Sequence, residues 1–321
     1  MTNSQLPRLP RLRQPPLRLL AVMSALAGVG AVEGRGAQAQ GVPSGSIYHR
    51  NADADEAGRG ERIVAAAIAG LGKAESISAR VRQLARVGDT VLKGGGRYVQ
   101  SGTGSEQRFR LESRLSSETE TFDLLEVCDG LFLWSYKKLG MQSAAVQRVD
   151  VQRVHEQLEA LKVGPRPSDG PYLGGIQRML ALVREWFQFT TTTAEELDGM
   201  PVWRVEGSWN KELLAGLLRA STRNHDDPAG ITAADLPEGM PWSVRLSIGR
   251  RELFPFRVEW LAIPGPRPAA TTTPEVVAVF ELYDVRLGEP VDATAFVYKP
   301  AMEGLIDVTD QQLKSLAALR P

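Results

Sequence analysis

Aromatic side chains at alternating positions are the clearest candidates for a chemical role in this sequence. The chain holds six tryptophans, most of them in segments where apolar and polar residues alternate. Such a period of two is typical of β-strands with one buried face. The rings could line one concave apolar surface that holds an apolar ligand, or they could simply fill the protein's own core. The candidate ligand-binding residues are Phe109, Leu111, Phe132, Trp134, Trp203, Trp242, Phe254, Phe256 and Trp260.

Residues that commonly carry catalysis or bind metals are sparse. The three histidines are His49, His155 and His225, and the last is followed by Asp226 and Asp227 in a segment that reads as a solvated loop. The sequence contains neither a G-x-S-x-G nucleophile elbow nor an H-E-x-x-H zinc motif. We therefore predict no catalytic residue, no metal site and no cofactor. The alternative is a secreted hydrolase of an unfamiliar type.

Three other features favour structural roles. The run Gly94–Gly96 precedes Arg97 rather than a Lys-Ser or Lys-Thr pair, so it indicates a bulge or sharp bend in a strand and not a phosphate-binding loop. The single cysteine, Cys128, lies in an apolar run and is predicted to be a small buried hydrophobe. Glu195 and Glu196 read as ordinary surface charge.

The N-terminus has the three parts of a secretory signal. Four arginines precede an apolar stretch from Leu19 to Val32, and Ala37-Gln38-Ala39 supplies small residues where a signal peptidase would cut. The apolar stretch is short for a membrane span. Residues 1–39 are thus predicted to be a cleavable Sec-type signal peptide of a periplasmic protein. The alternative is an uncleaved inner-membrane anchor with the domain facing the periplasm.

Charge and length constrain the rest of the chain. Residues 1–39 hold five of the 38 basic and one of the 38 acidic residues, which leaves 33 basic and 37 acidic side chains, a net charge of −4. Nucleic-acid binding lacks the basic surface that it requires. We predict a disordered leader over residues 40–60 and one domain over 61–321, with a polar insert near 208–240.

The elements that must position the aromatic residues form an α+β pattern. A helix comes first, antiparallel strands follow, and helices interrupt the series mid-chain instead of alternating with strands, which argues against a parallel sheet. A sheet of about ten strands tends to curl strongly. Helices are predicted near 63–71, 151–162, 174–187, 211–220 and 313–319. Strands are predicted near 77–82, 90–100, 108–115, 121–127, 131–136, 186–193, 201–207, 242–248, 254–260, 277–285 and 293–298.

Four stretches in this order resemble a known family, and the likeness spans about residues 60–310. Cys128–Tyr136 resembles a DG-x-x-x-W-x-Y hairpin, Leu197–Gly207 an x-G-x-P-V-W strand, and Leu253–Glu259 a strand with a proline and an arginine. Glu281–Pro300 resembles the closing strands. The family is the periplasmic lipoprotein carrier (LolA-like) superfamily, which includes lipoprotein-sorting proteins and sensory domains of some sigma-factor regulators.

The resemblance implies an unclosed half-barrel, with its N-terminal and mid-chain helices as a lid. It also implies an exported, non-enzymatic binding protein whose ligand is a lipid or an acylated, lipoprotein-like molecule, with transient membrane contact. The alternative is an envelope sensory or scaffold domain that binds another protein through the insert near 208–240. No ligand-contacting residue of the family matches a position here.

Overall fold

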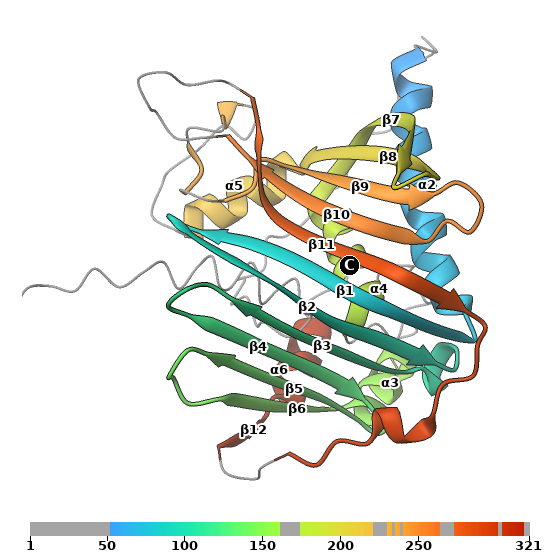
Figure 1. Cartoon of the computed structure of the whole chain (residues 1–321), viewed down its shortest axis with the longest axis vertical. Helices are drawn as coiled ribbons and strands as arrows, with labels where there is room; N and C mark the ends of the chain where they lie inside the picture. Colours follow the sequence, from blue (N-terminus) through green and yellow to red (C-terminus); the bar gives the residue numbers. More distant parts are fainter. Residues whose placement is uncertain are drawn as a thin grey trace, which may run out of the picture.

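A single open sheet of twelve strands organises the molecule (Figure 1). The computed structural model describes residues 52–160, 174–220, 230–232, 235–237, 240–263, 273–300 and 304–317. The strand order is β12-β6-β5-β4-β3-β2-β1-β11-β10-β9-β8-β7, so β12 and β7 are the two edges. Every pair is antiparallel except β12 with β6. The α+β class and the unclosed antiparallel sheet predicted from the sequence are confirmed.

The strands follow the alternating segments of the sequence closely. Their bounds are β1 (Ser76–Val87), β2 (Thr90–Ser101), β3 (Arg108–Ser116), β4 (Thr121–Cys128), β5 (Phe132–Leu139), β6 (Ala145–Asp150), β7 (Phe187–Leu197), β8 (Met200–Trp209), β9 (Ser243–Gly249), β10 (Pro255–Ala262), β11 (Glu275–Leu287) and β12 (Leu305–Asp307). In the β4–β5 turn, Gly130 has φ +95°, and the Asp129 carboxylate accepts hydrogen bonds from the N–H groups of Leu131 and Phe132.

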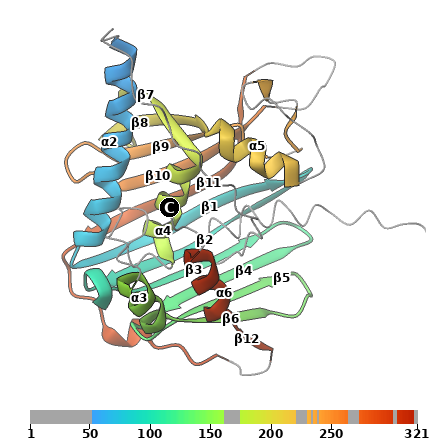
Figure 2. The same ribbon diagram turned by 180° about the vertical axis from the view of Figure 1, so that it is seen from behind.

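All five α-helices of the described residues lie against one face of the sheet (Figure 2). They are α2 (Ala52–Lys73), α3 (Val151–Ala160), α4 (Gly175–Trp186), α5 (Lys211–Ala220) and α6 (Thr309–Ala317). We call the helix-covered face the inner face and the other the outer face. None of the described helices is long and apolar enough to cross a membrane.

The main core lies between these helices and the inner face. Each helix contributes apolar side chains at helical spacing, and these meet the alternate apolar residues of the strands. The helix side chains that are nearly inaccessible to solvent are Val64, Ile68 and Leu71 of α2, Ile176, Leu180 and Val183 of α4, and Leu214 and Leu218 of α5. The described helices thus fill much of the concave side.

The three glycines of β2 permit an unusually close approach of its neighbouring strands. A Cβ added at Gly94 would lie 1.9 Å from the carbonyl oxygen of Arg114 in β3, and one added at Gly95 would lie 2.2 Å from that of Val81 in β1. The register of β2 with both neighbours is nonetheless regular, so of the predicted bulge or sharp bend, the bulge is wrong. The glycines leave room on the inner face, where the Ser113 hydroxyl of β3 donates to the Gln83 side chain of β1.

Alternating charges make the outer face compatible with water without helix cover. A chain of ion pairs crosses six adjacent strands from β7 to β1. Because each acid lies between arginines or beside one, the charges of the row are paired, and this half of the sheet is polar on one side, as antiparallel sheets permit. In spatial order the residues are Glu195, Arg204, Glu206, Arg245, Glu259, Arg257, Glu281 and Arg82.

The structure departs from the sequence predictions in several elements. Helix α2 starts at Ala52, so residues 52–60 of the predicted disordered leader are helical. Residues Ala293–Phe296 form a short 3-10 helix, η4, where a strand was predicted, because the Asp292 side chain accepts a hydrogen bond from the Thr294 N–H and caps the turn. Strands β6 and β12 were not predicted. The signal peptide and residues 40–51 lie outside the described residues.

Candidate functional site

The predicted aromatic residues do not gather on one surface. Phe109 and Leu111 of β3 and Trp260 of β10 belong to the main core beneath the helices. Each is at most 5% exposed. They lie on the inner face and pack against the protein's own side chains.

Phe132 and Trp134 lie on the outer face. Leu133, between them, faces the main core, and alternation along β5 sends its two neighbours the other way. Trp134 packs edge-on against Tyr298, with ring centroids 6.2 Å apart. The guanidinium of Arg148 lies 5.0 Å from the Phe132 ring centroid. These two rings therefore cannot share a ligand surface with Phe109.

The remaining candidates lie near the ends of their strands. Phe254 and Phe256 pack edge-on at a centroid distance of 5.2 Å, close to the β9–β10 turn. Trp242 is partly buried just before β9. Trp203 of β8 has two arginines over its ring, Arg59 at 4.2 Å and Arg250 at 4.6 Å from the centroid.

A buried polar cluster under the start of α4 was missed in the sequence. Glu126 of β4 is wholly inaccessible to solvent, and its Oε2 accepts a hydrogen bond from the backbone N–H of Gly175 at 3.3 Å. Its Oε1 has no hydrogen-bond partner. Ser135, directly across on β5, is also buried, and its hydroxyl has no partner either. Lys137 is the next residue of β5 on the same face, and its charge acts on Glu126.

Burial governs the protonation of this cluster. Loss of water raises the pKa of Glu126 to about 7, although the Lys137 charge and the Gly175 N–H both favour the carboxylate. Burial likewise lowers the pKa of Lys137, opposed by Glu126. The pKa of the Tyr98 phenol is raised, chiefly by its complete burial. The inner face thus holds an acid that titrates near neutrality beside a base.

Two glycines bring the start of α4 onto this cluster. A Cβ added at Gly174 would lie 2.6 Å from the Phe109 ring and 3.3 Å from Oε2 of Glu126. Gly175 has φ +68°, a left-handed conformation that other residues adopt at a cost. Farther along the first turn, the Gln177 side chain donates to the Ile68 carbonyl of α2 at 3.0 Å, while its own oxygen has no partner.

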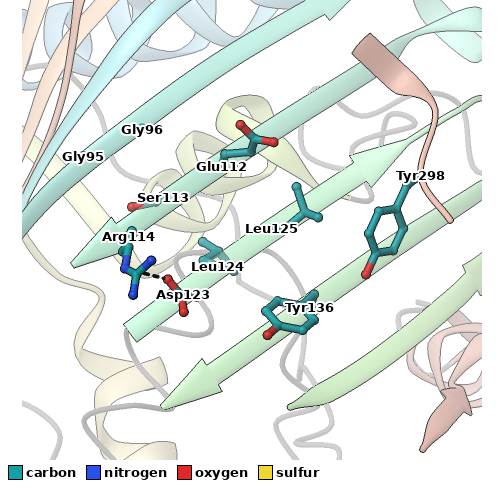
Figure 3. A pocket seen from close by; sticks show the side chains of 10 residues that line it. All are labelled: Gly95, Gly96, Glu112, Ser113, Arg114, Asp123, Leu124, Leu125, Tyr136 and Tyr298. Carbon is teal, nitrogen blue, oxygen red and sulfur yellow. Dashed lines mark ion pairs between the residues drawn. The ribbon is translucent and has the colours of Figure 1, made fainter. Parts of the chain in front are cut away.

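A hollow of about 490 Å³ lies on the outer face between β2, β3, β4 and β5 (Figure 3). Glu112, Arg114, Asp123, Tyr136 and Tyr298 line it. Its acids are paired, since Arg97 binds Glu112 at 2.7 Å and Arg114 binds Asp123 at 3.3 Å. Burial opposes ionisation of Glu112, but Arg97 and Arg110 outweigh it and lower its pKa. The hollow therefore presents tyrosine rings and neutralised charge.

The described residues contain no group of three or more metal-ligating side chains. Cys128 is buried, as predicted, and burial raises the pKa of its thiol to about 11, which suppresses the reactive thiolate. His155 is half-buried on α3, and burial lowers its pKa. His49, His225, Asp226 and Asp227 lie outside the described residues.

The sequence did contain a signal for the buried acid. In β4, Phe122, Leu124, Glu126 and Cys128 share one parity and face the core. A carboxylate among three apolar residues at that spacing is the unusual feature, because acids are rarely fully buried without a partner. The glycine pair at 174–175 supplied no comparable signal, since glycines before a helix are common.

No protein-family model matches the sequence, and no curated protein matches it. Several solved structures do. A structure of the Pseudomonas aeruginosa MucA/MucB complex aligns at 10% identity over 75% of this chain with a TM-score of 0.32, and the alignment spans 61% of that chain, less than two thirds. Lipoprotein LppX from Mycobacterium tuberculosis aligns at 9% identity over 74% of this chain and 98% of its own, with a TM-score of 0.28. A LolA superfamily protein from Nitrosomonas europaea aligns at 11% identity over 74% of this chain and 97% of its own, with a TM-score of 0.24. One of the structures to which this chain is similar is thus a LolA superfamily protein.

Proposed function

We propose that the protein is an exported, non-enzymatic binding protein that holds an acyl chain or a similar lipid-like ligand between the inner face and its helices. The supporting observation is the continuous apolar layer between these two surfaces. It is built from separate elements on a sheet whose edge strands, β7 and β12, do not pair with each other. An alkyl chain could replace helix side chains there with little change in buried apolar area.

The energetics favour a ligand of this type. Burial of an alkyl chain contributes about 0.8 kcal/mol per CH₂ group. Displacing a helix costs the apolar contacts of its own side chains, chiefly Ile176, Leu180 and Val183 in α4. A chain of a dozen or more carbons therefore recovers what the displaced side chains lose, whereas a short apolar molecule does not.

Native mass spectrometry of the protein purified from the periplasm, followed by solvent extraction, tests this proposal. Co-purifying lipid or acylated peptide, or uptake of an added fatty acid at one molecule per chain, is the expected result. A clean mass together with no uptake of any acyl probe would overturn it.

A protein partner is the second candidate, because the outer face has no α-helix over it within the described residues and carries the hollow at Tyr136 and Tyr298. Crosslinking of cells that produce Tyr136→Ala and Tyr298→Ala variants tests this reading. A protein partner requires a crosslinked band that disappears in these two variants. The band should persist in a variant with a conservative substitution at an inner-face residue. Uptake of lipid should be the same in all of them.

A further inference from the structure

Three buried oxygen atoms around the first turn of α4 have no hydrogen-bond partner. They are Oε1 of Glu126, Oγ of Ser135 and Oε1 of Gln177, and each residue is at most 2% exposed. A buried polar atom without a partner is costly, and native proteins contain few of them. Two of them, on Glu126 and Ser135, belong to cross-strand partners on the inner face, and this pair indicates a position where a hydrogen-bonding group of another molecule belongs.

The strand register brings two of the three acceptors together. Glu126 and Ser135 are direct partners in the β4–β5 register, and side chains opposed in this way lie about 4.5–5.5 Å apart at Cβ. The bond from Gly175 N–H to Glu126 joins them to the helix start, and Gln177 lies two residues farther along. The cluster combines side chains of β4 and β5 with the helix that covers them.

The charges of the cluster restrict what it can bind. Glu126 and Lys137 are of opposite sign and influence each other's ionisation. The unused oxygen of Glu126 is a strong hydrogen-bond acceptor when ionised. A hydroxyl or amide N–H donates to it, whereas a carboxylate or phosphate repels it at close range. Because Lys137 balances the charge of Glu126, the pair has no net charge that would attract an anion, and the unused Glu126 oxygen favours an uncharged head group with hydrogen-bond donors.

The start of α4 can uncover the cluster. Gly174 immediately precedes the helix, and Gly175, its first residue, has the left-handed backbone conformation that other residues resist. Apart from the Glu126 bond, the contacts of this start with β3 and β5 in the structure include the apolar side chains of Phe109 and Leu133. Displacement of this first turn from the sheet would expose the Glu126 carboxylate that it covers.

We propose that Glu126 and Ser135, with Lys137 beside them, bind the head group of the acyl ligand and select an uncharged head group that bears hydroxyl or amide N–H donors. This inference rests on the proposed function, since it assumes that an acyl chain enters between α4 and the sheet. It assigns the ligand class as acylglycerols or N-acyl amides, and it disfavours free fatty acids and lysophosphatidic acid.

The test compares four ligands with the same oleoyl chain at pH 8, where the ionised form of Glu126 predominates: 1-oleoylglycerol, oleoyl ethanolamide, methyl oleate and oleate. Displacement of a fluorescent acyl probe gives each affinity. The wild-type protein should bind the first two about tenfold more tightly than methyl oleate, the effect of one hydrogen bond to a charged group, and should bind oleate weakest.

Glu126→Gln isolates the role of the charge. This variant should bind oleate several-fold more tightly than wild type and should lose most of the preference for the hydroxyl ligand. Ser135→Ala should reduce that preference without improving oleate binding. Glu112→Gln, on the outer face, is the matched control and should behave as wild type. Thermal unfolding of each variant confirms that it is folded.

The outcomes separate the two claims. Equal affinity for all four ligands, unchanged in Glu126→Gln, would overturn the head-group site and leave the proposed function in place. Failure of the folded wild-type protein to bind any oleoyl ligand would overturn both.

Discussion

The carboxylate of Glu126 accepts a hydrogen bond from the backbone N–H of Gly175, so a fully buried acid of the sheet caps the helix that covers it. The start of an α-helix has unpaired N–H groups and a partial positive charge, both of which favour a carboxylate. Burial acts in the opposite direction and is the larger effect, since the pKa of Glu126 is raised to about 7. The bond therefore joins α4 to the sheet through a carboxyl group whose pKa lies near neutral pH.

Glu126→Gln should change how stability depends on pH. Between the ordinary pKa of 4.5 and about 7, the folded protein keeps a proton that the unfolded chain has released. Rising pH thus favours unfolding over this window, by on the order of 3 kcal/mol in total. Urea unfolding at pH 5 and pH 8 should show this loss in wild type and its absence in Glu126→Gln.

Glu112 should contribute to the pH dependence of stability in the opposite direction, and Glu112→Gln removes this contribution. The pKa of Glu112 is lowered by Arg97 and Arg110, so its contribution is present above the unfolded pKa and is lost as pH falls. Removing it should flatten the acid side of the stability curve and leave the loss between pH 5 and 8 intact. An identical pH profile for wild type and Glu126→Gln would contradict the assignment of this loss to Glu126.

Gly174→Ala should destabilise the protein by about 1–3 kcal/mol, the usual cost of forcing extra volume into a packed region. The new Cβ would meet the Phe109 ring at 2.6 Å. Phe109→Leu in the same chain should recover part of the loss, and urea midpoints of the four combinations measure the coupling. The control is Gly216→Ala in α5, where the added Cβ meets no atom within 4 Å. It should stabilise the protein by about 0.5–1 kcal/mol. Equal effects at the two glycines would refute the close packing of α4.

Glu281→Gln should destabilise the protein by about 1–3 kcal/mol. Glu281 is buried and accepts hydrogen bonds from Arg82 at 3.0 Å and Arg257 at 2.7 Å, so its neutralisation leaves two guanidinium groups without their shared carboxylate. Asp284→Asn on the same strand is the control, because its pair with Arg80 is exposed on both sides and should contribute no more than about 0.5 kcal/mol. Chemical unfolding at low and high salt distinguishes the two. A loss at Asp284 as large as that at Glu281 would show that burial does not matter here.

The order of elements could be read from the sequence because alternation is a local property. Phe109 and Leu111 share a parity with Leu115, and the structure places all three in the main core. The same information was present in β5, where Leu133 has the parity of the core and Phe132 and Trp134 do not. The size of the Phe132 and Trp134 rings suggested that they face the main core, which is wrong. Trp134 is instead covered on the outer face by Tyr298, which lies 164 positions away in the sequence.

Pairing across long distances explains the other differences. β12 has three residues and exists only through its parallel pairing with β6, which is itself six residues long. Neither has enough alternation to be recognised alone. Whether the concave side is open or filled was also beyond the sequence, because it depends on where α2, α4 and α5 pack. The buried oxygens without hydrogen-bond partners beneath α4 are a consequence of that packing.

Leu180→Ala should strengthen acyl binding while it weakens the fold. Leu180 lies in the centre of α4 and is fully buried against the main core, so its truncation should cost about 2–5 kcal/mol of stability. The same loss makes displacement of α4 easier and leaves space for an alkyl chain. We expect several-fold tighter binding of a fluorescent undecanoyl probe, measured at a temperature where the variant is folded.

Val127→Ala is the matched control for this experiment. Val127 is equally buried, but it lies opposite Trp134 in β5 and outside the main core cluster. Its truncation should lower stability without changing probe affinity, because no contact between α4 and the sheet is lost. If both variants bind the probe alike, whether tighter than wild type or unchanged, the ligand does not enter beneath α4. Tighter binding in Leu180→Ala alone places the acyl chain between this helix and the inner face.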